Sequence, residues 1–313
     1  MAELQCPERT LKELKNGLCV FKSPTNIGVA AQKTAAAKTQ IYFIDAGESP
    51  DDAKKALEEC GRLFGEFQLK AVICTHAHAD HIGGAAWLKQ KTSCEVWATQ
   101  AEKSVAETPQ IQAQSFYGAH PLPEIDIPYF HSARVDVDRV IEAGQKIACG
   151  GLEFEFVSLP GHSFDMVGVL AKSADATVFY AGDGIFSRSM LSRFWTPFIV
   201  DVRAFKESIG RAAGIQADYY VPSHGLPCDE ASGICELNLI STISNEKLIE
   251  DILAEPKTHE ELLKAFCDKS GIQMRLSQYM LIGSTLRSYL TYLYKEGRVK
   301  WFFEGNKMYW QAL

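Results

Sequence analysis

The first two thirds of the chain alternate short continuous apolar runs with segments of helical spacing, which predicts strands interleaved with helices. The run QIYFID at 40–45 has the length and composition of a short buried strand. Helix signals follow directly: Ser49 can cap, Pro50 fits the first helical position, and Gly65 comes just past the expected end. We therefore expect a strand and then a helix in this segment.

The next segment predicts a second strand and helix with a polar cluster between them. Residues 70–75 form a buried-strand pattern, and a helix begins at 85–89. Residues 103–130 have no clear period and contain three prolines, so we expect a loop or lid on the substrate side. Further strands are expected within 139–159, at 177–183 and within 217–225, and a helix at 204–214.

After about residue 235 the pattern changes to helices followed by a hairpin. Isoleucines within 239–253 lie at helical spacing, and Thr258 with Glu261 forms a capping-box pattern before a second helix. A third helix carries an apolar stripe within 282–293, and 296–311 predicts two strands joined by a Glu-Gly-Asn turn. Three helices and a hairpin in this order are typical of a winged helix.

Composition and charge exclude several classes of protein. The chain has 313 residues, 46% of them hydrophobic, and a net charge of −7, so it is neither disordered nor broadly attractive to nucleic acid. No apolar run has the length of a membrane helix, and the N-terminus has no apolar signal core. Nine cysteines, an odd number without a C-x-x-C pair, predict free thiols. We expect a cytoplasmic protein that does not contact a membrane.

The polar cluster after the second strand predicts a metal site. It runs His76-Ala77-His78-Ala79-Asp80-His81, and neutral imidazole and carboxylate are the nitrogen and oxygen ligands of Zn²⁺. The side chains at 76 and 78 share one direction and those at 80 and 81 another, which indicates two adjacent ions. Each ion needs more ligands, and three candidates follow expected strands beside Gly or Pro: His162, Asp183 and His224.

The order H-x-H-x-D-H, P-G-H-S, G-D and H-G over residues ~15–230 resembles the metallo-β-lactamase-fold superfamily. The resemblance implies an α+β protein, an αββα four-layer sandwich with the metals at one edge of the two sheets. It implies a catalytic domain at 1–235, and we expect a winged-helix-like domain at 236–313. By this resemblance His76, His78 and His162 hold the first ion, Asp80, His81 and His224 hold the second, and Asp183 bridges them.

A dinuclear centre implies hydrolysis. Two cations lower the pKa of a shared water toward neutral, and the resulting hydroxide attacks a carbonyl carbon or a phosphorus. Asp80 is placed both to bind metal and to hold or pass on the proton of the nucleophile. Thr75 and Asp45 are candidate partners that orient the imidazoles, although a purely structural role in the loops explains these residues about as well. Two Zn²⁺ ions are expected, although His/Asp sets also suit Fe or Mn.

Three residues outside the ligand pattern are candidates for contact with substrate: Arg188, His120 and Tyr117. Arg188 follows the bridging aspartate closely and can bind an anionic group, although a solvated surface arginine is the favoured interpretation. The C-terminal segment lacks the glutathione-binding signature expected of a glyoxalase II. It resembles instead the appendix of lactamase-like endoribonucleases and of uncharacterised hydrolases.

Three functions are compatible with the sequence. The first is hydrolysis of a small ester, thioester or lactone, the second is winged-helix-guided cleavage of single-stranded RNA or another phosphodiester, and the third is a non-catalytic metal-binding regulatory role. A closed pocket would favour the first, and an open basic groove from the metals to Arg287 and Lys300 would favour the second. The net charge of −8 over residues 1–240 favours a small-molecule substrate. The C-terminal segment can also pack against a twin subunit in a homodimer.

Overall fold

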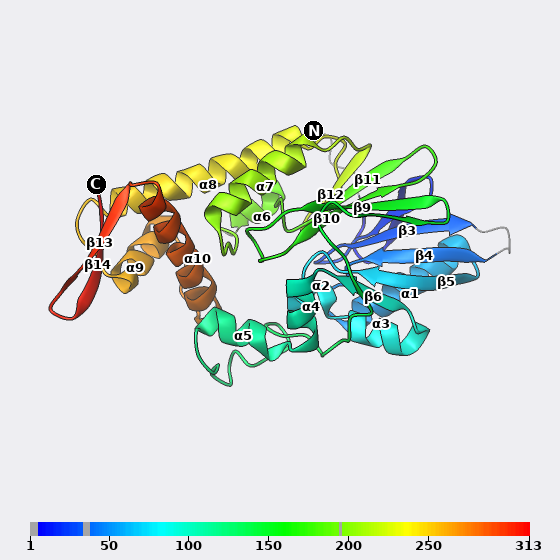
Figure 1. Ribbon diagram of the computed structural model, residues 1–313, viewed down its shortest axis with the longest axis horizontal. Coiled ribbons are helices and arrows are strands. Elements are labelled where there is room, and N and C mark those ends of the chain that lie inside the picture. Colours follow the sequence, from blue (N-terminus) through cyan, green and yellow to red (C-terminus); the bar gives the residue numbers. More distant parts are fainter. Residues whose placement is uncertain (1–5, 34–37, 194–195) are drawn as a thin grey trace.

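Two β-sheets face each other in one half of the molecule, on the right in Figure 1, and the C-terminal elements extend to the other side. The structure is a computed structural model that describes residues 6–33, 38–193 and 196–313. Within these residues the first sheet has the order β1-β2-β3-β4-β5-β6-β7 and the second the order β12-β11-β10-β9-β8. The strands of the first sheet are β1 (Leu11–Lys15), β2 (Leu18–Phe21), β3 (Ile27–Lys33), β4 (Thr39–Ile44), β5 (Phe67–Ile73), β6 (Glu95–Ala98) and β7 (Arg139–Val140). Those of the second are β8 (Lys146–Cys149), β9 (Leu152–Ser158), β10 (Val167–Lys172), β11 (Thr177–Gly182) and β12 (Tyr219–Pro222).

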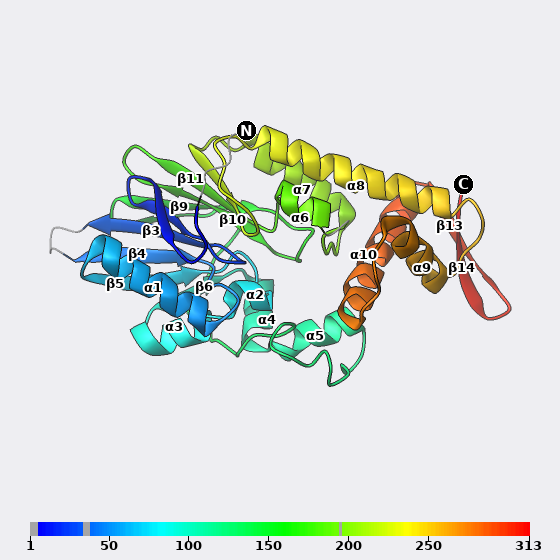
Figure 2. The same cartoon turned by 180° about the vertical axis from the view of Figure 1, so that it is seen from behind.

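Helices cover the outer face of each sheet, as Figures 1 and 2 show from opposite sides. On the first sheet they are α1 (Pro50–Phe64) and α3 (Ala85–Thr92), and on the second α7 (Val202–Gly214). The long helix α8 (Ser232–Ile252) packs against α7 and runs on to the C-terminal helices. The remaining helices of this part of the chain are short: α2 (Ala79–Ile82), α4 (Gln100–Glu107), α5 (Gln110–Tyr117) and α6 (Arg188–Arg193).

Buried and exposed side chains alternate along the strands, and the buried side chains pack between the two sheets. In β9, Phe154 and Phe156 are fully buried between the sheets, whereas Glu153 and Glu155 point outward and are partly exposed. Phe154 packs against Tyr42 of β4 with ring centroids 5.1 Å apart, which joins the two sheets. The αββα prediction is therefore confirmed.

The helix signals at the start of α1 act as the sequence predicts. The Ser49 hydroxyl accepts a hydrogen bond from the backbone N–H of Asp52, and Pro50 opens the helix. Gly65 follows the last turn with φ of 72°, a conformation that L side chains rarely adopt. These local signals fix where the helix begins and ends.

The segment 103–130 is more ordered than expected. It contains the end of α4 and all of α5, each eight residues long and separated by Pro109. Two-turn helices give a weak periodic signal, and the fully buried positions of α5 are Gln112 and Ala113, which do not form an apolar stripe. The prediction of a loop was wrong for these two stretches.

The C-terminal part follows the expected element order. After α8 come α9 (His259–Ser270), α10 (Leu276–Lys295), β13 (Val299–Glu304) and β14 (Lys307–Ala312). The capping box of Thr258 and Glu261 is present, and the hairpin turns at Gly305 and Asn306, both with positive φ. The boundary at residue 235 falls in the first turn of α8, and the two-domain division and the winged-helix assignment stay predictions.

The C-terminal helices share a hydrophobic core with the second sheet. Phe205 of α7, Ile249 of α8 and Leu286 of α10 belong to one buried cluster with Phe179 of β11. The start of α10 thereby lies next to α5, and Figure 2 shows the helix reaching back toward the sandwich.

Two further expectations concern the chain as a whole. None of the helices among the described residues is long and apolar enough to cross a membrane. All nine cysteines are free, and eight of them are buried.

Candidate metal centre

The histidine-rich segment leaves the sheet at the end of β5 and then turns into α2. His76 and His78 lie in the extended part, and His78 is the residue before the helix, with φ of −64° and ψ of 147°. Asp80 and His81 lie within α2, where successive side chains point in different directions. This change of backbone divides the segment into two pairs of side chains, as the spacing predicts.

The other three candidates follow strands of the second sheet: His162 after β9, Asp183 after β11 and His224 after β12. Glycines shape these turns. Gly161 has φ of 126°, and a Cβ there would lie 2.4 Å from the backbone nitrogen of Phe205. Gly225 has φ of 154°, and a Cβ there would lie 2.5 Å from the Cβ of Ser187.

The structure brings the first three candidate ligands together. The Nδ1 atom of His78 lies 3.0 Å from Nε2 of His76 and 2.8 Å from Nε2 of His162. A tetrahedral ion with ligands at ~2.0–2.1 Å separates its ligand atoms by about 3.3 Å, close to these distances. The three nitrogens therefore form one candidate group.

A second group forms beside the first. Nε2 of His224 lies 3.3 Å from Oδ2 of Asp80, and Nε2 of His81 lies 3.6 Å from the same oxygen. Asp183 lies between the groups, because its Oδ2 is 3.3 Å from Nε2 of His162 and 3.5 Å from Nε2 of His224. This position is the one that a bridging carboxylate requires.

Asp45 orients two of the imidazoles from behind. Its Oδ2 accepts hydrogen bonds from Nδ1 of His81 at 2.8 Å and from the Thr75 hydroxyl at 2.9 Å, and that hydroxyl lies 3.1 Å from Nδ1 of His76. The Asp45 backbone has φ of 62°, which a non-glycine residue rarely adopts, and its side chain is buried. Both residues proposed from the sequence as orienting partners therefore contact the ligand imidazoles.

Backbone carbonyls orient two more imidazoles. Nδ1 of His162 donates to the Phe198 carbonyl at 2.8 Å, and Nδ1 of His224 donates to the Pro24 carbonyl at 2.9 Å. With Nδ1 engaged in this way, Nε2 of each ring faces the cluster as an acceptor. Only the global fold brings Phe198 and Pro24 to these places.

Glu102 of α4 connects the two ligand loops, and the sequence analysis did not find it. Its carboxylate accepts from the backbone N–H of Ala77 at 2.8 Å, from the Ser163 hydroxyl at 2.5 Å and from the backbone N–H of Asp165 at 3.3 Å. Burial raises the pKa of Glu102, and these hydrogen bonds oppose that rise. A lone glutamate in a short helix carries no sequence signal for such a role.

The pKa values of two histidines in the cluster are shifted in opposite directions. Burial and neighbouring imidazoles lower the pKa of His78 to about 3, so this ring is neutral and able to bind a cation. Burial also lowers the pKa of His81, but Asp80, Asp183 and Asp45 outweigh it and raise that pKa to about 10. Proton and metal thus compete for the second group.

Two buried atoms at the centre lack a hydrogen-bond partner among the described residues. They are Nε2 of His81 and Oδ1 of Asp183, which lie 3.5 Å from each other without the geometry of a hydrogen bond. Buried polar atoms are rarely left without a partner, and both point into a set of nitrogen and oxygen ligands. The donor set, its spacing and these two atoms fit a site for divalent cations.

A cavity of about 380 Å³ opens above the cluster. His78, Asp80, His162, Asp183 and His224 lie at its base. Its walls are mostly apolar and come from the 110–130 region, the 186–198 region and α10: Phe116, Tyr129, Phe130, Phe186, Met190, Leu191, Phe198, Leu281 and Ile282.

The three substrate candidates from the sequence lie elsewhere. Arg188 begins α6, Tyr117 ends α5 and His120 follows it, all three are exposed, and none lines this cavity. The residues that do line it include Gln278 and Thr285 of α10, which sequence reasoning missed because the contact spans more than 100 residues of chain.

The fold and site define an αββα protein with a candidate His/Asp metal centre between its two sheets. A family model described as the Metallo-beta-lactamase superfamily matches residues 38–224, more than half of the chain, and the chain belongs to this superfamily.

Curated relatives and solved structures are similar to this chain. A hydroxyacylglutathione hydrolase from Haemophilus influenzae is 31% identical over 148 residues, 46% of this chain and 60% of that protein. A probable metallo-hydrolase from Bacillus subtilis is 26% identical over 208 residues, 60% of this chain and 76% of that protein. A beta-lactamase domain protein from Burkholderia ambifaria is 17% identical, covers 100% of this chain and 96% of its own, and has a TM-score of 0.79.

These comparisons support the fold more fully than the activity. The alignments span 60% of the Haemophilus relative and 42% of a hydroxyacylglutathione hydrolase from Rhodopseudomonas palustris. At 17% identity the Burkholderia structure supports the fold alone, including the C-terminal helices.

Proposed function

We propose that this chain is a dinuclear metal-dependent hydrolase that acts on a small ester, thioester or lactone. The observation that carries this proposal is the seven-residue His/Asp cluster at the base of an apolar cavity. His76, His78 and His162 would hold one ion, Asp80, His81 and His224 the other, and Asp183 both. Two Zn²⁺ ions fit this set, and Fe or Mn fit it as well.

Cations held by these seven residues would supply Lewis acidity, which lowers the pKa of a bound water and polarises a scissile carbonyl. Asp80 has the more exposed carboxylate of the cluster, 29% against 6% for Asp183, and it lines the cavity. It is therefore the group that holds the proton of the attacking water and passes it to the leaving group. Phe116, Phe186 and Phe198 exclude bulk water from the reacting atoms.

The curated relatives are consistent with this substrate class, because hydroxyacylglutathione hydrolases are among them. The cavity above the cluster is compact and mainly apolar, which fits a small acyl group. Location in the cytoplasm and a homodimer stay predictions.

The test is hydrolysis of a panel of thioesters, esters and lactones by metal-loaded protein, with His76→Ala as the control. We expect turnover of at least one class by the wild type and none by the variant. Equal turnover by both proteins, or none by a wild type with two ions bound, would contradict the proposal.

A second candidate is cleavage of single-stranded RNA. It is favoured by Arg287 and Lys295 of α10, which line a cavity that reaches the metal-ligand candidate His78. Incubation with a labelled single-stranded RNA tests it. Cleavage by the wild type and not by His76→Ala would support the nuclease, and intact RNA would leave the small-molecule hydrolase.

A further inference from the structure

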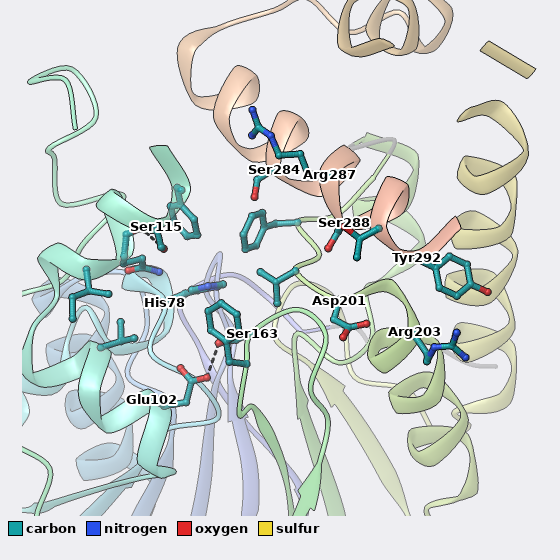
Figure 3. A pocket seen from close by; sticks show the side chains of 18 of the residues that line it. His78, Glu102, Ser115, Ser163, Asp201, Arg203, Ser284, Arg287, Ser288 and Tyr292 are labelled. Atoms are coloured by element: carbon teal, nitrogen blue, oxygen red, sulfur yellow. Dashed lines mark hydrogen bonds between the residues drawn. The ribbon is translucent and has the colours of Figure 1, made fainter. Parts of the chain in front are cut away.

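A second cavity of about 400 Å³ adjoins the one above the metal cluster (Figure 3). Both are lined by His78, Gln112, Phe116 and Phe198, so they meet beside a candidate metal ligand. The second cavity has no role in the proposed hydrolysis. Its position beside the reacting centre makes it a place for the part of a substrate that the first cavity does not take.

One face of α10 forms the wall of the second cavity. Ser284, Arg287, Ser288, Thr291 and Lys295 line it, and their spacing of three and four residues places them on one side of the helix. In Figure 3, Ser284, Arg287 and Ser288 extend from α10 on one side of the space, and His78, Glu102 and Ser163 lie on the other.

The charges on these walls leave two cations unpaired. Arg203 forms an ion pair with Glu296, the Glu102 carboxylate is engaged by three hydrogen bonds, and Asp201 caps α7. Arg287 and Lys295 form no ion pair with any described residue. A cavity lined partly by apolar side chains such as Val105 and Ile111, with these two cations on its helix, fits an elongated group that carries an anion.

Gln112 occupies the junction of the two cavities. Its side chain is 5% exposed, and its Oε1 is buried without a hydrogen-bond partner among the described residues. Leaving a buried amide unpaired costs free energy, so such groups in a binding cavity are commonly completed by a ligand. Gln112 is therefore placed to bind a polar group of the substrate next to His78.

We propose that the substrate is an acyl ester or thioester that spans both cavities. Its apolar acyl arm lies among Leu281, Ile282 and Met190 of the first cavity. Its leaving arm lies along α10 in the second and ends in a carboxylate or phosphate bound by Arg287 and Lys295. This inference rests on the proposed hydrolase function and names its substrate class.

The reaction balances without a further reagent. The oxygen of water bonds to the acyl carbon, the carbon–sulfur or carbon–oxygen ester bond breaks, and the leaving arm departs with one proton from that water. Gln112 is a positioning residue in this step, because it holds the substrate at the junction and takes no part in the bond changes.

The test uses two matched pairs of octanoyl thioesters with the metal-loaded full chain. N-acetylcysteamine and N-succinylcysteamine differ by a terminal carboxylate, and pantetheine and pantetheine 4′-phosphate differ by a phosphate. We expect the wild type to favour the anionic member of at least one pair by about tenfold in kcat/KM, and R287Q/K295Q to lose that preference through KM. The preferred pair identifies the anion as carboxylate or phosphate.

Two control variants sharpen the result. Arg275→Gln removes an arginine that lines the first cavity, and Lys300→Gln removes an exposed lysine of β13 that lines neither. Neither change should alter the preference for the anionic thioester. Loss of the preference in Arg275→Gln instead of R287Q/K295Q would place the anion in the first cavity and overturn the assignment of the arms.

Gln112→Met tests the junction. It replaces the unpaired amide by a side chain of similar length, so the melting temperature should hold or rise while kcat/KM for the neutral and the anionic thioesters falls about tenfold. A lower melting temperature with unchanged kinetics would assign Gln112 a structural role only.

The outcomes separate this inference from the function on which it rests. Hydrolysis of all four thioesters with equal efficiency would overturn the anionic arm and leave the hydrolase. If the protein with two ions bound hydrolyses none of the thioesters, both the thioester function and this inference are wrong. If the same preparation cleaves single-stranded RNA, the side of α10 with Arg287 and Lys295 would instead bind nucleic acid.

Discussion

The cavity above the candidate metal cluster has a base and a C-terminal wall that are built in opposite ways. At the base, imidazole rings are oriented by Asp45, Thr75 and backbone carbonyls, and the candidate ligand atoms of each group lie within 4.8 Å of one another. On the wall, α10 presents aliphatic side chains, an amide and cations, and Arg275, Arg287 and Lys295 form no ion pair with the described part of the chain.

This difference separates reactivity from selectivity. A metal centre requires ligand positions fixed to within fractions of an ångström, and the hydrogen bonds behind the rings supply that order before any ion binds. Substrate choice requires unpaired groups that a ligand completes, and the wall has them. Substitutions at the base should therefore abolish chemistry, whereas substitutions on the wall should change which substrate is accepted.

The largest expected effect comes from removing a ligand at the base. His76→Ala removes one of the three nitrogens of the first candidate group, so we expect activity to fall by at least about a thousandfold, with the loss of bound metal. Elemental analysis and kinetics on the same preparation, with circular dichroism to verify folding, measure it. Full activity with fewer than two ions would contradict the dinuclear proposal.

The next largest effect is expected at Asp45, which forms hydrogen bonds with the candidate ligand His81 and with Thr75. Asp45→Asn exchanges a carboxylate oxygen for an amide and disrupts the hydrogen bonds to His81 and Thr75, so metal affinity should fall by about 10–100-fold. Competitive metal titration measures this loss. Asp51→Asn, an exposed position in the first turn of α1, is the matched control and should bind metal as the wild type does.

Glu102→Gln should act mainly on stability. The amide keeps one acceptor but presents a donor to N–H and O–H groups that already donate, at a cost of about 1–3 kcal/mol in the free energy of unfolding.

Burial raises the pKa of Glu102, so the folded wild type binds its proton more tightly, and this contribution to stability is lost as pH rises from about 4.5 through the raised value. Denaturation of the metal-free proteins should show that the free energy of unfolding depends less on pH in the variant than in the wild type. The same pH dependence in both proteins would show that Glu102 does not cause it.

The smallest effect is expected on the wall. Leu281→Ala enlarges the first cavity without touching the ligands, so we expect metal content and kcat to stay near wild type while KM for octanoyl thioesters rises severalfold. A series of acyl chain lengths measures it. A large fall in kcat with lost metal would show that α10 also supports the base, and the contrast between the two regions would fail.

Much of the base was predictable from the chain alone. The spacing from His76 to His81, and the Gly and Pro residues beside His162, Asp183 and His224, are local patterns, and the structure brings all seven candidates together in one cluster. Asp45 and Thr75 were predicted for the same reason, since each adjoins a strand end. The αββα layers follow from alternation in strands such as β9.

The wall and the supports behind the base depended on tertiary structure. Gln112 and Glu102 lie in two short helices without a clear apolar period, and the sequence predicted a loop over most of that region. Arg188, Tyr117 and His120 were chosen for residue type and proximity in the chain, yet α10, about 100 residues beyond Asp183, lines both cavities. Metal-ligand spacing is a local property that a short peptide can encode, because geometry within a few residues decides it. A cavity is formed by side chains from distant segments, and only the packing of α10 against α5 and the second sheet brings those segments together.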